Sequence, residues 1–301
     1  MRSGALNPPV DRDRFDPGVV QQLGRLDLIA DLLSAGFLQG IRRSRHHGFS
    51  TEFSEYKPYV PGDDLRFLDW RVYARCEKLF VRRFEAETSL DVLLLLDATA
   101  SMAWRWQDTV TKLQYGANLI AAIACICTQH NDRPGLLVHD AVRLSNLPPR
   151  CRHEQLDAIF TVLESIQPGG GDSLPALIEG LAGTRRHRCA IIICSDLEED
   201  EEYTTMALEM LSYTDDRVHM IHLLHHAEEE LPFGAVTHFE DSETRQRVRA
   251  DIAALRKRHG ETVSGFRATW RERCHRWGIG YQPVDTGMNY LDVLLDIAGL
   301  R

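Results

Sequence analysis

The sequence predicts an α/β protein built on a doubly wound, mostly parallel sheet of six strands. Two apolar runs, at 92–96 and 190–194, lack any alternation with polar residues, as is typical of strands buried on both faces. From residue 90 onward such runs alternate with helical patterns, which indicates strand–helix–strand units. Six strands in this arrangement suit the sheet order 3-2-1-4-5-6, in which the first and fourth strands are neighbours.

The expected elements follow in a regular order. A helix over 23–38 precedes irregular structure with short strands at 49–88, so we divide the chain into regions 1–88 and 89–301. Strands are expected at about 90–96, 135–139, 141–146, 189–195, 217–224 and 278–284. Helices are expected within 109–129 and 248–277 and at about 153–166, 174–182, 203–213 and 290–298, with a hairpin at 238–244. Gly260 and Gly265 are positions at which the longest helix can break.

Oxygen-bearing side chains follow both central strands. Asp97, Thr99 and Ser101 come after the first strand, and Ser195-Asp196 ends the fourth. Because neighbouring parallel strands end at the same edge of a sheet, we expect these side chains to share one crevice. Carboxylates and neutral oxygens are the ligands that a hard cation such as Mg²⁺ takes. The alternative is a strand-to-helix turn in which the hydroxyls only cap the helix.

This pattern resembles the metal-ion-dependent adhesion site of von Willebrand factor A-like domains, whose first loop usually reads Asp-x-Ser-x-Ser. The resemblance implies that Thr99 and Ser101 bind Mg²⁺ or Mn²⁺ directly, while Asp97 and Asp196 act largely through water. It also implies that one coordination position stays open for an acidic residue of a partner protein.

A third loop often adds a threonine ligand in that family, and here the loop at 169–173 reads Gly-Gly-Gly-Asp-Ser. One alignment places Gly171 at the threonine position, which leaves no side chain. Shifting by one residue places Asp172 there, a charged ligand in place of a neutral one, and Ser173 is a further alternative. Asp172 is therefore our candidate third-loop ligand.

A second signature lies upstream of the sheet, where residues 59–70 read Tyr-Val-Pro-Gly-Asp-Asp-Leu-Arg-Phe-Leu-Asp-Trp. Pro61-Gly62 predicts a type II turn, and the charged residues around it suit an internal ion-pair lattice more than a ligand site. Further matching positions are Gly48, Glu52-Phe53, Ala74-Arg75, Phe84-Glu85, Trp270, Cys274, Gly278 and 284–287. Together they resemble the family known as domain of unknown function 58, over about residues 36–301.

The resemblance implies a bacterial protein with a von Willebrand A-like domain that associates with MoxR-type AAA+ ATPases, often beside other von Willebrand A proteins. Such a domain is expected to be an adaptor in metal-dependent protein assembly or maturation and not an enzyme. Trp104 and Trp106 follow the metal loop and can anchor a partner, unless they pack against the helix beneath.

Two other functions stay open at this level, a Mg²⁺-dependent phosphoester hydrolase and a structural domain with a dead metal site. The sequence has no phosphate-binding loop of the Gly-x-x-x-x-Gly-Lys type and no His-Glu-x-x-His motif, which disfavours an enzyme. The histidines at 219, 222, 225 and 226 are interpreted as scattered structural residues, because a spacing of three on a strand puts His219 and His222 on opposite faces.

Charge and composition limit the partners. The net charge is −9, and residues 91–301 hold 21 basic against 31 acidic side chains, which argues against nucleic-acid binding. No stretch reaches the roughly 20 apolar residues that cross a bilayer, and the N-terminus lacks the apolar core of a signal peptide. Seven scattered cysteines suit reduced thiols. We therefore expect a cytoplasmic protein without direct membrane insertion.

Overall fold

The computed structural model describes residues 11–44, 56–60, 72–73, 75, 78–82, 89–107, 109–169, 174–182, 189–198, 200–233, 236–240 and 247–299. The chain forms two compact units. One combines Met1–Gly40 with Leu90–Arg301, and the other is Ile41–Ser89.

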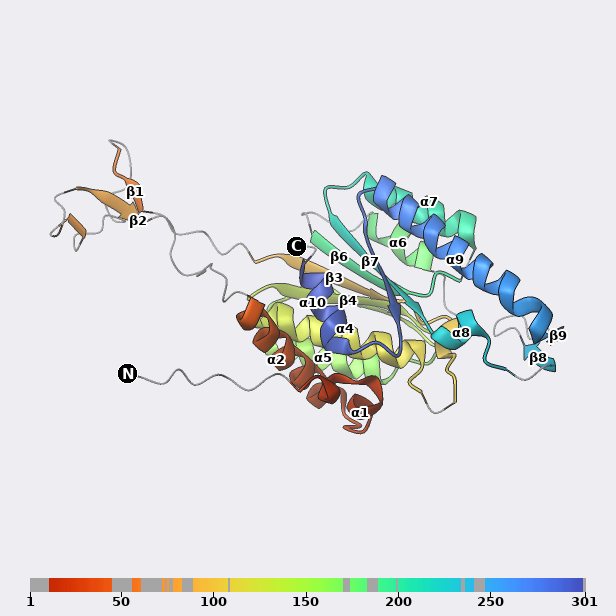
Figure 1. Ribbon diagram of the computed structural model, residues 1–301. Coiled ribbons are helices and arrows are strands. Elements are labelled where there is room, and N and C mark those ends of the chain that lie inside the picture. Colours follow the sequence, from red (N-terminus) through yellow and green to blue (C-terminus); the bar gives the residue numbers. More distant parts are fainter. Residues whose placement is uncertain are drawn as a thin grey trace. The chain divides into compact units, whose positions relative to one another are not determined.

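A six-stranded sheet is the centre of the larger unit (Figure 1). Its strands lie in the order β10 (Gly280–Asp285), β7 (Arg217–Leu224), β6 (Cys189–Ser195), β3 (Asp91–Leu96), β4 (Arg133–His139) and β5 (Leu144–Leu147). Neighbouring strands are parallel except for the antiparallel pair of β4 and β5. Numbered along the chain, this is the order 3-2-1-4-5-6. The predicted fold class, a doubly wound and mostly parallel sheet of six strands in this order, is confirmed.

Helices cover both faces of the sheet (Figure 1). On one face lie α2 (Leu26–Ser44), α4 (Lys112–Gln129), α5 (His153–Glu164) and α10 (Tyr290–Gly299). On the other lie α6 (Leu174–Ala182), α7 (Glu201–Ser212) and α9 (Ile252–Arg276). The core strands β3 and β6 are apolar because both of their faces are covered, and Leu94, Leu95 and Ile193 are fully buried.

Helix α4 lies unusually close to the sheet. Thr111 and Gln114 form a capping box at its start, which fixes where the helix begins. A Cβ atom on Gly116 would lie 3.0 Å from Leu96 Cδ1 and 3.1 Å from Cys194 Sγ, so the close approach requires glycine. The first turn of α4 is thereby held beside the ends of β3 and β6.

The N-terminal helices pack on the sheet unit. The segment contains η1 (Arg12–Phe15), α1 (Pro17–Gln21) and α2. Asn289 Nδ2 donates to the carbonyl of Arg12 at 2.7 Å, and Gln129 Nε2 donates to Ser34 Oγ at 3.4 Å. The larger unit thus includes η1, α1 and α2 as far as Gly40 together with residues 90–301. Our division at 88/89 placed the N-terminal helix with the signature region.

The expected hairpin near the C-terminal end is present as β8 (Val236–Glu240) and β9 (Arg247–Asp251), with its turn outside the described residues.

Helix α9 runs unbroken through Gly260 and Gly265, the two positions at which a break was possible. A Cβ at Gly260 or Gly265 would meet nothing within 4 Å, and one glycine costs only about 1 kcal/mol in a helix interior. The buried side chains of Trp270 and Cys274 anchor this long helix. Short α8 (His226–Glu230) was not predicted.

The smaller unit contains β1 (Tyr56–Pro58) paired antiparallel with β2 (Phe80–Arg82). These are short strands, as expected for this region. The Pro61-Gly62 turn and the charged residues of the signature lie outside the described residues.

Candidate metal centre

Asp97 is the hub of a hydrogen-bond network at the carboxyl ends of β3 and β6. Its Oδ1 accepts from the backbone N–H of Thr99 at 2.9 Å and from the Thr99 hydroxyl at 2.8 Å. Its Oδ2 accepts from Ser195 Oγ at 2.6 Å. Both oxygens of this buried carboxylate are therefore used to hold the two loops together.

The hydroxyls of Thr99 and Ser101 lie side by side, with 3.0 Å between Oγ1 and Oγ. Adjacent oxygens in an octahedral Mg²⁺ shell, at 2.0–2.1 Å from the ion, are also about 3 Å apart. Because Thr99 donates its only hydroxyl hydrogen to Asp97, its oxygen accepts from Ser101 in this pair and keeps one further lone pair. Thr99 precedes η4 (Ala100–Ala103), but within the described residues its side chain makes no capping hydrogen bond, which disfavours the capping alternative.

Asp196 is fully buried at the end of β6, and His222 holds its backbone. His222 Nε2 donates to the carbonyl of Asp196 at 3.0 Å, because a carbonyl can only accept. Its Nδ1 then accepts from the hydroxyl of Tyr281 at 2.6 Å. Burial lowers the pKa of His222 to about 4, so the ring is neutral, as this pattern requires.

Lys112, the first residue of α4, reaches the same place. Its Nζ lies 2.7 Å from Asp196 Oδ2, 2.9 Å from Glu228 Oε1 and 3.2 Å from Glu198 Oε1. The side chain is 1% exposed. Burial alone would lower the pKa of Lys112, but the three carboxylates outweigh it, and the pKa lies above its usual value. The amine is therefore a permanent cation.

The electrostatics of the crevice favour a further cation. Burial, and then the charge of Asp196, raises the pKa of Asp97 to about 6. A divalent ion beside Thr99 and Ser101 would relieve this crowding of negative charge. Within the described residues no group of three or more His, Cys, Asp or Glu side chains is arranged to hold a metal. The donor set fits a hard ion held by hydroxyls and supported by carboxylates.

Residues 55–268 match the family described as "Protein of unknown function DUF58". The chain belongs to this family. It is 29% identical over 197 residues to uncharacterized protein Rv1480 of Mycobacterium tuberculosis (strain ATCC 25618 / H37Rv) and to uncharacterized protein Mb1516 of Mycobacterium bovis. Each alignment covers 64% of this chain and 62% of the relative, so the chain spans less than two thirds of these proteins.

Three solved structures are similar in fold to this DUF58 protein. An aerotolerance-related membrane protein from Bacteroides fragilis has 19% identity and a TM-score of 0.45, covering 70% of this chain and 98% of that one. BatB from Bacteroides thetaiotaomicron has 16% identity, a TM-score of 0.44 and the same coverage. The SpRpn10 VWA domain has 12% identity and a TM-score of 0.38, covering 69% and 95%.

The third loop of this DUF58 chain starts against the first. The N–H of Gly169 donates to the carbonyl of Ala98 at 2.8 Å, and the positive φ of 112° at Gly169 suits glycine. Asp172, with its alternatives Gly171 and Ser173, lies outside the described residues. The proposed third-loop ligand therefore stays a prediction.

Both tryptophans are half-buried, and neither ring is free of packing. Trp104 meets the His225 ring edge-on, with 5.2 Å between centroids, and Trp106 meets Phe233 edge-on at 4.9 Å. Their rings thus pack on the segment that follows β7. The exposed parts of both rings remain partner-binding candidates.

The four histidines do not form one cluster, although the rings of His225 and His226 stack with 4.3 Å between their centroids. His225 is buried and caps α8 by accepting from the N–H of Ala227 at 3.0 Å. His219 Nε2 lies 3.4 Å from Gln282 Oε1, and His226 is exposed. His222 positions the loop of Asp196.

Sequence reasoning missed Lys112 and His222. A signal for Lys112 was present: a lysine at the first position of an apolar helix opposes the helix dipole and therefore needs a nearby anion. His222 had no such signal, because its partners come from β6 and β10 and meet only in the folded sheet.

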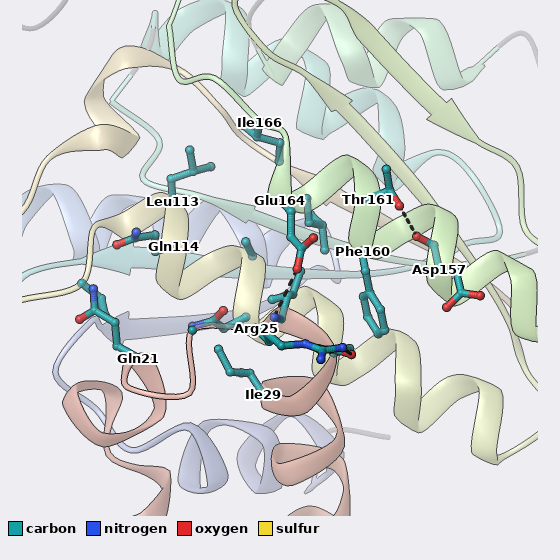
Figure 2. Close-up of a pocket in the computed structure, with 17 residues that line it drawn as sticks. Gln21, Arg25, Ile29, Leu113, Gln114, Asp157, Phe160, Thr161, Glu164 and Ile166 are labelled. Carbon is teal, nitrogen blue, oxygen red and sulfur yellow. Dashed lines mark hydrogen bonds and ion pairs between the residues drawn. The ribbon is translucent and has the colours of Figure 1, made fainter.

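A separate hollow of about 860 Å³ lies among α2, α4 and α5 (Figure 2). Leu113 and Phe160 give it apolar walls, and Glu164 accepts from the N–H of Leu26 across it at 3.4 Å. Arg25 at this hollow is paired with Asp27. Its side chains do not include those of the metal centre.

Among the described residues, every helix falls short of the length and apolar character that a membrane span requires.

Proposed function

We propose that this protein is a metal-dependent, protein-binding adaptor that acts without catalysing a reaction. The observation that carries the proposal is the pair of hydroxyls of Thr99 and Ser101, 3.0 Å apart in a crevice rich in carboxylates. Neutral oxygens would hold Mg²⁺ or Mn²⁺ without cancelling its charge. A bound ion would supply a positive centre for an acidic side chain of the partner.

The protein's own residues would prepare this centre. Asp97 orients the Thr99 hydroxyl and ties it to the β6 loop through Ser195. His222 fixes the backbone of Asp196, which follows directly on the strand that carries Ser195. A site held by hydrogen bonds before binding loses little conformational entropy when a partner docks.

The partner that we propose is a MoxR-type AAA+ ATPase, with other von Willebrand A proteins as further candidates. Support comes from the family resemblance and from Trp104 and Trp106, which are half-buried and follow Ser101 closely in the chain. Aromatic side chains beside a charged centre are typical anchors of protein interfaces. We place this interaction in the cytoplasm, and the described cysteines, which are free thiols, are compatible with that.

A pull-down with a MoxR-type ATPase from the same organism tests the proposal. Recovery should require Mg²⁺ and should be lost with EDTA or with Ser101→Ala, which removes one hydroxyl. Ser145→Ala is the matched control, because Ser145 lies on the edge strand β5. Equal recovery of all variants with and without metal would show that this face does not bind the ATPase.

A further inference from the structure

We propose that Lys112 is a built-in counterion that keeps the Asp196 carboxylate off the bound cation. The ion would then be held mainly by hydroxyls and would keep its charge for the partner. This inference rests on the cation site of the proposed function, and it assigns a role in that site to a residue outside the Asp-x-Thr-x-Ser loop.

Protein groups already engage both oxygens of Asp196. Oδ2 lies 2.7 Å from Lys112 Nζ, and Oδ1 accepts from the N–H of Glu198 at 3.3 Å. For Oδ2 to ligate a metal directly, it must weaken this ion pair, and for Oδ1 to do so, it must share its lone pairs with the N–H of Glu198. The cost is high because both partners are buried, Lys112 at 1% and Asp196 at 0% exposure.

The position of Lys112 is difficult to explain by helix stability. It is the first residue of α4, where a positive charge is unfavourable to the helix dipole. Its surroundings compensate with three carboxylates, from Asp196, Glu198 and Glu228. The three carboxylates therefore stabilise the buried ammonium, and the ammonium in turn stabilises the buried charge of Asp196.

Lys112 is also tied to the metal loop itself. Its backbone N–H donates to the carbonyl of Trp104 at 3.2 Å, and the N–H of Trp104 donates to the carbonyl of Ser101 at 3.1 Å. The backbones of Lys112 and Ser101 are thus linked through Trp104. This connection fixes the start of α4, which carries Lys112, relative to the loop of Ser101.

The consequence concerns the charge that a partner meets. Direct ligation by Asp196 would reduce a divalent ion to a net charge of one and would halve its Coulomb attraction for an incoming carboxylate. With Asp196 held by Lys112, the bare ion binds more weakly, but it attracts an acidic partner more strongly. Lys112 would therefore lower the affinity of the site for the metal and raise the affinity of the metal-bound site for an acidic partner.

The test is titration calorimetry of Mg²⁺ into the full chain, its Lys112→Met variant and its Lys112→Arg variant. Lys112→Met should tighten the Mg²⁺ dissociation constant by about tenfold or more, because Asp196 becomes free to ligate. Lys112→Arg keeps the charge and should stay within about threefold of the parent. Equal or weaker affinity in Lys112→Met would overturn the proposal, since it would make Lys112 a structural counterion or a support of the site.

A double-mutant cycle with Asp196→Asn gives a second readout. In the parent, Asp196→Asn should change Mg²⁺ affinity by less than about fivefold, whereas in the Lys112→Met background it should remove the gain. If the gain survives Asp196→Asn, the freed carboxylate is not its cause and the proposal fails.

Lys112→Met leaves three carboxylates without their cation and can unfold the chain. Lys112→Met combined with Glu228→Gln removes one carboxylate with the cation, and it is compared with Glu228→Gln alone. The outcomes also separate the two proposals. If the parent binds Mg²⁺ and the variants bind no tighter, only the role of Lys112 is lost. If neither binds, both proposals fall, and if only the variants bind, Lys112 blocks the site and the metal dependence of the parent is refuted.

Discussion

The Ser195 hydroxyl at the end of β6 donates a 2.6 Å hydrogen bond to the Asp97 carboxylate at the end of β3. The sheet register makes this contact possible, because Leu96 pairs with Cys194 across the two parallel strands. Residues 98 positions apart in the sequence thus meet where the two central strands end. The placement of the candidate metal-binding side chains is a direct consequence of the strand order.

Replacing Asp97 with asparagine should remove metal-dependent stabilisation without unfolding the protein. Burial and the charge of Asp196 raise the pKa of Asp97 to about 6, so its ionised form is disfavoured in the folded state. A neutral isostere relieves that penalty but breaks the support of the hydroxyl pair. In thermal melts, the parent should gain stability in millimolar Mg²⁺, whereas Asp97→Asn should not.

Asp91→Asn is the control for this experiment, because Asp91 lies at the other end of β3 and pairs with Arg133 at 2.6 Å. It should keep the Mg²⁺-dependent rise in melting temperature. An unchanged melting temperature of the parent in Mg²⁺ would count against the metal centre itself.

Asp140 should make the stability of the fold depend on pH. Burial alone would raise its pKa, but the backbone N–H groups of Val142, Arg143 and Gln167 donate to the carboxylate, and the pKa lies below its usual value. A lowered folded-state pKa adds stability above the unfolded-state pKa of about 4, and this stability is lost as the pH falls through the folded-state pKa. Asp140→Asn should therefore be less stable than the parent at pH 7.

The difference between the two proteins should shrink as the pH falls below about 4, which urea unfolding at pH 7, 5 and 3 can measure. A gap that stays constant over this range would show that Asp140 is not ionised in the way its hydrogen bonds imply.

A side chain at Gly116 should destabilise the protein, because α4 lies close to the sheet at this position. An added Cβ would lie 3.0 Å from Leu96 Cδ1 and 3.2 Å from Leu223 Cδ1. Gly116→Ala should lower the free energy of unfolding by about 1–3 kcal/mol, the usual cost of overpacking. Gly260→Ala is the matched control, because its Cβ would meet nothing within 4 Å, and it should stabilise α9 by about 0.5–1 kcal/mol. Equal effects of the two variants in urea unfolding would contradict the close packing of α4.

Much of the fold could be predicted from the sequence, because the apolar runs of β3 and β6 are typical of strands that are buried on both faces of a parallel sheet. The location of Asp97 and Asp196 at the same edge of the sheet followed from the same strand order. Lys112 and His222 could not be predicted with their partners, because those contacts depend on how α4 and β7 pack. The unbroken α9 shows that glycine alone does not end a helix that tertiary contacts hold.

His222 should support the fold by holding the loop of Asp196. It satisfies the carbonyl of Asp196 and the hydroxyl of Tyr281, so His222→Leu leaves two polar groups without their partner. An unsatisfied buried group costs about 1–3 kcal/mol, and the loop of Asp196 also loses its support. We expect a lower free energy of unfolding in urea, while Mg²⁺ affinity in calorimetry should change by less than about fivefold, as for Asp196→Asn. Tyr281→Phe removes only the hydroxyl that donates to Nδ1, so it should cost less stability. If His222→Leu costs no more stability than Tyr281→Phe, then the hydrogen bond to the Asp196 carbonyl adds nothing and His222 does not hold this loop.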